Sequence, residues 1–300
     1  AQRLGFAAIS RVMAGADPAS EAAALAEPMR QVLARAAEDS AGAALLLALP
    51  SERAVAERCQ PLDPGAVCRA RSALEAALGA CLADGLWALL PALRGSGPYR
   101  AAGEDVGRRT LAQRCLALLA AAGAEGIDAE LASRFDTAGN MTERLGALRL
   151  LVSYDLHGAG ERLAAFAERY ADEALVMDQW FAVQAMVPGD ETAARVAELL
   201  RHPAFEMTSP NRVRALLGSF ANGNPSAFHV ADGSGYRLYT KALAELDRVN
   251  PQVAARMANA LAVLPRLVPA LQAVMRTATE ELRGSECSVN LAEVLDRVLG

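Results

Sequence analysis

The sequence of 300 residues predicts an all-α protein, and three observations support this prediction. Alanine and leucine, the residues with the highest intrinsic helix propensities, dominate a composition that is 53% hydrophobic. Aromatic residues make up only 5% of the chain and β-branched residues are also few, so good strand formers are scarce. One helix-start signal, a capping residue followed by proline, recurs along the whole chain.

The helix starts follow one chemical pattern. An Asp, Asn or Ser side chain accepts hydrogen bonds from the orphan backbone N–H groups of the first helical turn. The proline that follows takes the first helical position, where its missing N–H costs nothing. The pattern occurs at Asp17-Pro18, Asp63-Pro64, Ser209-Pro210, Asn224-Pro225 and Asn250-Pro251. Asn140 and Glu143 form a related pair that resembles a capping box.

Apolar periodicity between these signals predicts many helices joined by short links. Short links make consecutive helices antiparallel, so we expect stacked antiparallel helix pairs in a solenoid-like bowl, similar to a HEAT or ARM superhelix without a strict repeat. We expect one all-helical domain over 1–300, with a possible internal seam at 95–103. The expected helices cover 2–14, 18–38, 42–49, 52–59, 64–93, 104–122, 126–136, 141–154, 158–170, 172–186, 190–201, 210–221, 235–249, 251–264, 267–283 and 288–298.

Charge and composition exclude several classes of function. The formal net charge is −5 and no cationic block is present, so we expect no nucleic-acid partner. No run of 18 apolar residues occurs, and we expect no membrane span. The first residues lack the order of a signal peptide, and five cysteines without Cys-x-x-Cys spacing favour free thiols in a reducing cytoplasm. Because the chain begins inside a helical pattern without an initiator Met, we expect a segment of a longer polypeptide.

Motifs that bind catalytic metals or nucleotides are missing from the sequence. Its histidines, His157, His202 and His229, never form the His-Glu-x-x-His pair that places two imidazoles one helical turn apart. Calcium-loop spacing and a Walker loop are also missing, and the glycines at 233–235 lack the third glycine of a dinucleotide fingerprint. We therefore expect no metal, no cofactor and no catalytic residue in this chain.

One local cluster has the residue types of a hydrolytic triad. His229, Asp232 and Ser234 lie within six positions, whereas the members of a triad converge from separate elements. We expect a turn with both glycines of 232–235 at positive φ, then a helix that begins near Tyr236 and is capped by Ser234 or Asp232. A local hydrolase built on the three residues is kept as the weakest alternative.

The helix after Asn250 carries polar residues on one face. Gln252, Arg256 and Asn259 follow one another at i, i+4 and i+7, as residues of one face do. This face is either a solvated surface or the lining of a polar cavity. The buried stripe of the same helix is expected at Val253, Met257, Leu261 and Leu264.

Two arginines precede this region. Arg212 and Arg214 are two residues apart on a helix and cannot share a face, so one should point inward to a carboxylate or carbonyls and the other to solvent or a partner. In the segment before them we expect Trp180 and Phe181 in the core, with Asp178 and Gln184 facing outward.

Several long blocks of the sequence resemble one family. The blocks are LLLALPSERAVAE (45–57), the capped helix from Asn140, LVMDQWFAVQA (175–185), LLRHPAFEMTSPNRVRALLGSFANGNPSAFHVADGSGY (199–236) and NPQVAARMANAL (250–261). They are similar to the C-terminal helical domain of the bacterial aminopeptidase N family, the M1 zinc metallopeptidases, and the resemblance covers nearly the whole chain.

The resemblance implies a role without chemistry of its own. In that family the zinc ligands and the catalytic glutamate lie in a preceding domain, so the implied cofactor is zinc in the full-length enzyme. The implied partners are the catalytic domain of the same polypeptide and peptide substrates. This chain would enclose the catalytic cavity and control the access of peptides. By the family pattern, Gln252 and Arg256 line the substrate cavity, and Arg214 and Asn211 are further candidates.

A different class of function remains open. Stacked short helices also form free-standing scaffolds that bind protein partners on a concave face. The coding sequence that precedes Ala1 distinguishes the two hypotheses, because only the peptidase requires an upstream His-Glu-x-x-His motif.

Overall fold

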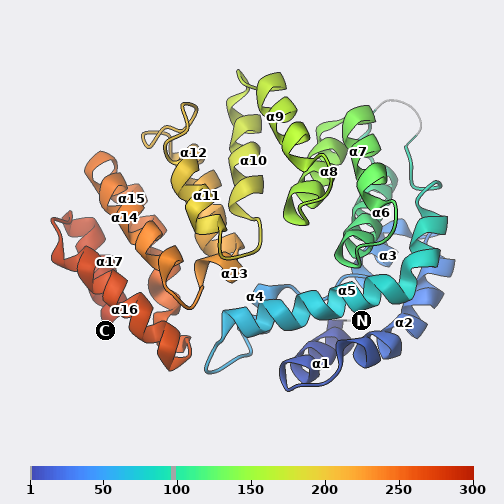
Figure 1. Cartoon of the computed structure of the whole chain (residues 1–300), viewed down its shortest axis with the longest axis horizontal. Coiled ribbons are helices and arrows are strands. Elements are labelled where there is room, and N and C mark those ends of the chain that lie inside the picture. The colour runs from blue at the N-terminus through green and yellow to red at the C-terminus, as the bar shows by residue number, and fades with distance from the viewer. Residues whose placement is uncertain (1, 96–98) are drawn as a thin grey trace. The chain divides into compact units, whose positions relative to one another are not determined.

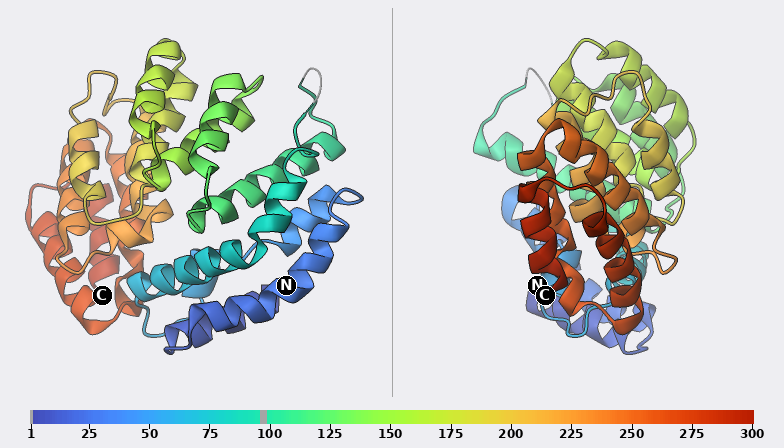
Figure 2. Two further views of the ribbon diagram at one scale, coloured as in Figure 1. Left: turned by 45° about the vertical axis from the view of Figure 1, so that its right-hand side comes forward. Right: turned by 90° about the vertical axis from the view of Figure 1, so that its left-hand side faces the viewer.

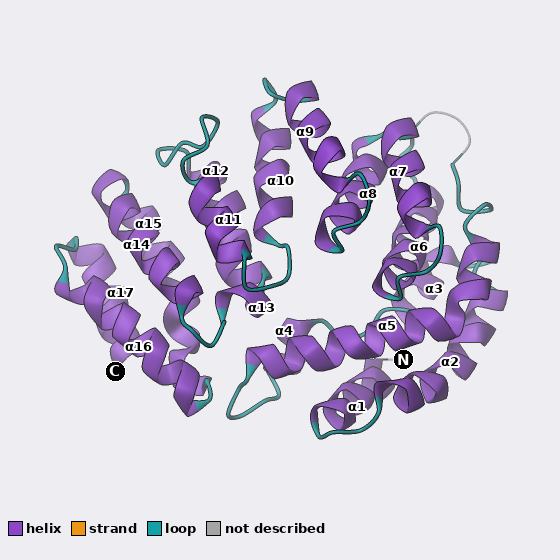
Figure 3. Cartoon of the chain, in the orientation of Figure 1, coloured by secondary structure: helices purple, strands orange, loops and turns teal. Residues whose placement is uncertain are grey.

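The structure is a computed structural model that describes residues 2–95 and 99–300, which form seventeen α-helices (Figures 1 and 3). A π-helix and a 3-10 helix complete the regular structure of these residues. Within them the strand-like pairing consists of one isolated bridge between Leu62 and Leu267. The prediction of an all-α fold is confirmed.

The helices have the following bounds: α1 Gln2–Met13, α2 Pro18–Ala34, α3 Ser40–Leu46, α4 Glu52–Ala56, α5 Pro64–Leu89, α6 Gly103–Ala121, α7 Ile127–Thr137, α8 Met141–Ser153, α9 Ala159–Arg169, α10 Ala174–Ala185, α11 Thr192–Leu199, α12 Pro210–Val213, η1 Arg214–Gly223, α13 Pro225–Phe228, α14 Ser234–Val249, α15 Pro251–Ala258, η2 Asn259–Arg266, α16 Pro269–Gly284 and α17 Val289–Leu299. Most predicted helices agree with these bounds to within a few residues.

Capping side chains start the helices as the sequence predicts. The Asp17 carboxylate accepts hydrogen bonds from the backbone N–H groups of Ala19 and Ser20, and α2 then begins at its proline. The Asn140 side chain caps α8 in the same way. Each cap satisfies backbone donors that the helix itself leaves without partners.

Two predicted helices change type along their length. The helix expected over 210–221 is α-helical only through Val213 and continues as the π-helix η1. The helix expected over 251–264 tightens into the 3-10 helix η2 after Ala258. Pro265 lies in η2 and has no N–H to donate to an α-helical ladder. No comparable breaker lies within η1, so the sequence gives no sign of the wider turn.

The chain divides into two compact units. The first comprises Ala1–Glu57 and Ala66–Ala164, and the second comprises Arg58–Gly65 and Ala165–Gly300. The predicted seam at 95–103 includes residues 96–98, which lie outside the described residues, and the single domain over 1–300 stays a prediction.

The first unit is built around leucine-rich helices. α6 packs against α3 and α8, and α7 packs against α8. The Arg71 guanidinium on α5 donates to the Pro50 carbonyl at 3.0 Å and to the Glu75 carboxylate at 2.8 Å, which ties α5 to the link before α4. Arg71 and Glu75, which enter this core, thus find partners inside it.

The second unit places α10 to α17 in chain order, from yellow-green to red (Figure 1). α14 packs against α15 and α16, and the red helices α16 and α17 lie side by side in both views of Figure 2. The early segment 58–65 belongs here because its backbone bonds to the link before α16. Leu62 donates its N–H to the Arg266 carbonyl at 2.7 Å and accepts from the N–H of Val268 at 2.9 Å.

Helix α5 is long and apolar enough, by length and composition, to cross a membrane. It satisfies this looser criterion although the sequence has no wholly apolar run of 18 residues. Its leucines Leu74, Leu78 and Leu86 are fully buried inside the fold. Only 33% of its apolar window is buried in the described structure, and a single helix that meets this criterion is weak evidence for a membrane span.

The substitution Gly79→Ala tests the close approach of α5 and α6. A Cβ at this position would lie 2.0 Å from the backbone oxygen of Leu118, which cannot move without shifting α6. We expect the free energy of unfolding to fall by roughly 1–3 kcal/mol. Urea denaturation followed by circular dichroism measures the change.

The matched control is Gly160→Ala in α9, where nothing lies within 4 Å of the added Cβ. Because alanine has the higher helix propensity, we expect a gain of up to roughly 1 kcal/mol here. A similar effect of the two substitutions would contradict the close approach as the reason for glycine at position 79.

Candidate functional site

A buried arginine organises the start of the region that the sequence singles out. Arg212 on α12 donates from Nε to the Asp178 carboxylate on α10 at 2.5 Å. Its other nitrogens donate to the carbonyls of Ala174 and Ala204, and its guanidinium lies 4.9 Å from the centre of the Phe181 ring. Arg212 is therefore the inward arginine of the predicted pair. Its side chain connects α12 to α10 and to the link that follows α11.

The expectation that Asp178 and Gln184 face outward is wrong. Their relative exposures are 8% and 6%, and Gln184 donates to the Trp180 carbonyl one turn earlier. Helix α10 contacts α11, α12 and η1, so little of its surface is left for solvent. Trp180 and Phe181 are buried as expected and pack edge to face against each other.

Arg214 is the outward arginine. It is exposed at the start of η1, and its guanidinium donates to the exposed side chain of Asn211, three residues earlier in α12. The two polar candidates are thus brought together on one surface. Whether this surface lines a substrate cavity stays a prediction.

The polar face after Asn250 forms as predicted. Gln252, Arg256 and Asn259 are all exposed, although Asn259 already belongs to η2. The buried side of α15 consists of Ala254, Met257 and Ala258, whereas Val253, expected in the stripe, is only half-buried. The buried Tyr239 hydroxyl on α14 donates to the Met257 carbonyl at 2.8 Å. Helix α15 packs against α14 and α17, and Ala254 lies on its buried side.

The three residues of the supposed triad have separate partners. His229 Nδ1 lies 2.8 Å from the Tyr236 hydroxyl, and the Asp232 carboxylate accepts from the backbone N–H of Ser234 at 2.8 Å. The first bond forms a partly buried pair and the second forms a turn, so the three residues form no proton relay through His229. The N-cap residue of α14 is Gly233, so neither Ser234 nor Asp232 takes the expected cap position, although the Asp232 carboxylate satisfies the N–H of the first helical residue.

Two further details of this turn differ from the expectation. Helix α14 begins at Ser234 instead of near Tyr236. Gly233 has a φ of +74°, but Gly235 lies within the helix and has no positive φ. Glycine is required at 235 for space, because a Cβ there would lie 2.4 Å from the Phe228 carbonyl oxygen.

Potential metal ligands are scattered through the described part of the chain. Residues 2–95 and 99–300 contain no group of three or more His, Cys, Asp or Glu that could hold a metal ion. The five cysteines are free thiols, and burial raises the pKa of both Cys68 and Cys115 to about 12. These two thiols therefore stay protonated and unreactive at neutral pH.

The substitution Arg212→Met tests the buried ion pair. It leaves the Asp178 carboxylate buried without its charge partner, so we expect the free energy of unfolding to fall by roughly 3–5 kcal/mol. The double variant Arg212→Met/Asp178→Leu should recover a large part of this loss. Arg214→Met, which removes the exposed arginine two residues away, should change stability by less than about 0.5 kcal/mol. Chemical denaturation measures all three, and equal losses in the two single variants would contradict the assignment of Arg212 as the inward arginine.

The half-buried His229 should make stability depend on pH. Burial lowers its pKa from 6.5 to about 4 in the folded protein. The unfolded chain then binds a proton that the folded chain does not, so stability falls as the pH drops from about 6.5 toward 4. The slope from this one group is at most about 1.4 kcal/mol per pH unit.

The variant His229→Asn measures this contribution, because the carboxylates that titrate in the same range are shared with the parent protein. We expect the variant to show a shallower pH dependence of unfolding below pH 6.5. Superimposable pH profiles of the two proteins would show that His229 is not held neutral by burial.

Comparison with known proteins shows the family of the chain. The family described as "Domain of unknown function (DUF3458_C) ARM repeats" matches residues 1–300. Aminopeptidase N of Escherichia coli (strain K12) is 38% identical over 276 residues, which are 92% of this chain and 32% of that protein. Aminopeptidase N of Caulobacter vibrioides is 36% identical over 277 residues, with the same two shares. The chain thus spans about a third of the length of these relatives.

A solved structure has the same fold. Legionella pneumophila aminopeptidase A, determined in complex with aspartic acid, matches with a TM-score of 0.83 and 24% identity over 94% of this chain and 36% of that chain. At this identity the likeness concerns the fold alone. Since the family match runs from the first residue to the last, the chain belongs to the DUF3458_C family of ARM-repeat domains and is similar to the C-terminal part of aminopeptidase N.

Proposed function

We propose that this chain is the C-terminal domain of a zinc aminopeptidase that removes N-terminal amino acids from peptides. The observation that carries the proposal is the similarity to aminopeptidase N over 92% of this chain but only 32% of that relative. A catalytic domain of the same polypeptide would occupy the remaining length. The five free thiols suit a reducing compartment, and a cytoplasmic location is part of the proposal.

The zinc ion of such an enzyme would belong to that remaining part. The residues of this chain do not fit a zinc site, because no cluster of three metal-ligating side chains exists in the described ranges. Two of the three imidazoles are also engaged otherwise. His202 Nδ1 accepts from the Ala204 N–H at 3.1 Å, and His229 Nδ1 pairs with the Tyr236 hydroxyl. The chain would therefore contribute to the reaction by shape and not by metal binding.

In this role the ARM-repeat helices wall the catalytic cavity and admit unfolded or short peptides while excluding folded proteins. Packed helix pairs suit such a wall where a helix, such as α15, buries one side and leaves the other exposed. In α15 the buried side is Ala254, Met257 and Ala258, and the free side carries Gln252 and Arg256. A polar free side suits a peptide backbone, which presents carbonyls and N–H groups along its length.

We further propose that Arg256 and Gln252 bind the end of the peptide away from the cleaved bond. A guanidinium can donate two parallel hydrogen bonds to a carboxylate, which is the group at the C-terminus of a short peptide. Gln252, one turn earlier on the same face, offers both an amide donor and an acceptor. Asn211 and Arg214, which are hydrogen-bonded to each other and exposed, form the second polar set of this proposal.

The test uses the complete polypeptide that contains this chain, with Arg256→Ala and Gln252→Ala variants. For short peptides we expect Arg256→Ala to raise KM by about tenfold, the cost of one charge-assisted hydrogen bond. An aminoacyl anilide has no distant carboxylate, so its kinetics should not change. Arg195→Ala removes an exposed arginine of α11 and is the control.

The 300-residue chain alone, supplied with zinc, should not hydrolyse the anilide. Turnover by the chain alone would refute the proposal that the chemistry lies elsewhere. An unchanged KM for peptides in Arg256→Ala, with the complete polypeptide active, would refute only the role of Arg256.

A further inference from the structure

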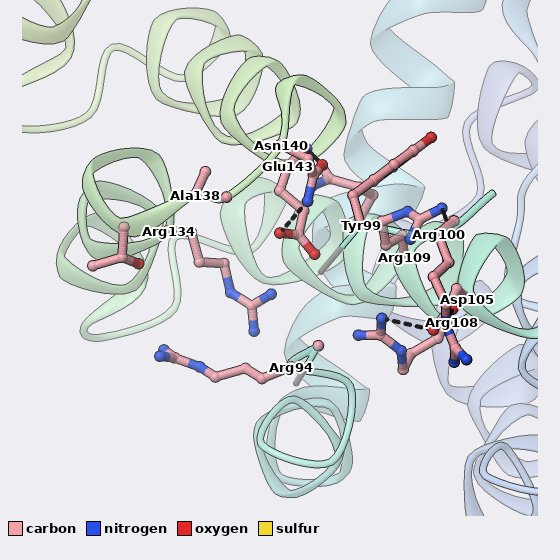
Figure 4. Close-up of a pocket in the computed structure, with 14 residues that line it drawn as sticks. Arg94, Tyr99, Arg100, Asp105, Arg108, Arg109, Arg134, Ala138, Asn140 and Glu143 are labelled. Atoms are coloured by element: carbon pink, nitrogen blue, oxygen red, sulfur yellow. Dashed lines mark hydrogen bonds and ion pairs between the residues drawn. The ribbon is translucent and has the colours of Figure 1, made fainter. Parts of the chain in front are cut away.

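A polar pocket lies within the first unit, apart from the residues considered above. It has a volume of about 440 Å³, which is the size of a small-molecule site. The turn after α5, the start of α6, the end of α7 and the start of α8 line it (Figure 4). Its lining is unusual for this acidic chain, because five arginines contribute: Arg94, Arg100, Arg108, Arg109 and Arg134.

The carboxylates around the pocket do not balance these arginines. Asp105 bonds to both Arg100 and Arg108, at 2.8 and 3.2 Å. Glu130, behind the lining, bonds to both Arg94 and Arg134, at 2.7 Å each. The third carboxylate is Glu143, which lines the pocket and accepts from the Asn140 amide at 2.8 Å. Five guanidinium groups against three carboxylates leave a surplus of two positive charges.

One donor in this cluster has no partner. The Arg134 side chain is only 10% exposed, and its Nε bonds to Glu130. Its Nη2 is also buried, but makes no hydrogen bond. A buried charged donor without an acceptor is costly, and such groups are rare in folded proteins. In Figure 4 the Arg134 side chain lies between those of Arg94 and Glu143. The orphaned nitrogen belongs to a residue that lines the pocket.

The arginines are also held in place before any ligand arrives. Burial opposes ionisation of Glu130, but hydrogen bonds from Arg134 and Arg94 outweigh it and lower the pKa of this carboxyl. Arg109 is buried, donates to the Arg100 carbonyl at 2.9 Å and lies 4.6 Å from the centre of the Tyr99 ring. Fixed guanidinium groups lose little conformational freedom when an oxyanion binds.

From the charge surplus, the cavity and the orphaned donor together, we propose that this pocket binds a small dianionic oxyanion, with the Arg134 guanidinium among its donors. Guanidinium groups match the oxygen geometry of phosphate and of carboxylate, so the ligand carries a phosphoryl group or two carboxylates. A dianion matches the surplus of two charges. The site shares no residue with the polar face of α15 and does not depend on the proposed peptidase role.

The experiment is isothermal titration calorimetry on the chain with inorganic phosphate and with succinate, at constant ionic strength set by chloride. Acetate, a monoanion, is the comparison ligand. We expect saturable binding of at least one dianion, accompanied by a rise in the midpoint of thermal unfolding, and weaker binding of acetate. Phosphate binding alone assigns a phosphoryl ligand, and succinate binding alone assigns a dicarboxylate; either result supports the site.

Variants test the part played by the orphaned donor. Arg134→Gln should weaken dianion binding by about tenfold or more, because it removes both the charge and the fork of donors. Arg134→Lys keeps the charge without the fork of donors, so its affinity for the dianion should lie between those of the parent protein and of Arg134→Gln. Arg53→Gln removes an exposed arginine of the same unit, 90% exposed in its side chain, and should leave binding within about twofold of the parent.

Arg94→Gln provides a second variant if Arg134→Gln does not fold, because the Arg94 side chain is half exposed and lines the same pocket. It should also weaken dianion binding, since it removes one of the two surplus charges. Binding of neither dianion beyond the chloride background would overturn the proposal and leave the orphaned donor to a water molecule. Unchanged dianion binding in Arg134→Gln, or in Arg94→Gln where that variant is used, would overturn it as well.

Discussion

Burial of polar groups between alanine- and leucine-rich helices requires each such group to find a partner inside the fold, and much of the tertiary structure follows from this constraint. Arg212 shows it most clearly, because its guanidinium satisfies the Asp178 carboxylate and two backbone carbonyls at once. A buried Asn224 donates to the carbonyls of Ala185 and Val187 at the end of α10. Directional hydrogen bonds from polar side chains thus connect the ends of helices, whereas apolar contacts between the helices are not directional.

The same constraint acts elsewhere in both units. In the second unit the buried Asp247 carboxylate accepts from the backbone and the side chain of Ser288, both at 2.6 Å, and so ties the end of α14 to the start of α17. In the first unit Arg144 donates to the carbonyls of Phe135 and Ala138 at the end of α7. Against this background two buried donors of the described residues are exceptions, Arg134 Nη2 and Arg162 Nε, and the first belongs to the proposed dianion site.

The candidate site was predictable in its periodicity but not in its orientation. Gln252 and Arg256 lie on one exposed face because residues four apart share a helical face whatever surrounds the helix. The direction of each arginine before them could not be assigned, because Arg212 and Arg214 have identical chemistry and the choice depends on where Asp178 lies. The arginine pocket of the first unit escaped sequence reasoning altogether. Its arginines come from two helices, α6 and α7, and from the link between α5 and α6, and no local spacing shows that they converge.

The sequence by itself determined the all-α class, the helix starts at capping residues and the family, because these depend on local propensity, local hydrogen bonds and long ordered blocks of residues. The tertiary structure decided which polar residues are buried, as in the inward turn of Asp178 and Gln184. It also decided where helix type changes, as in the π-helix η1, and why Gly235 must be glycine. These features depend on contacts between residues of different helices or links. Local sequence patterns do not specify such contacts, because they form only when the helices pack.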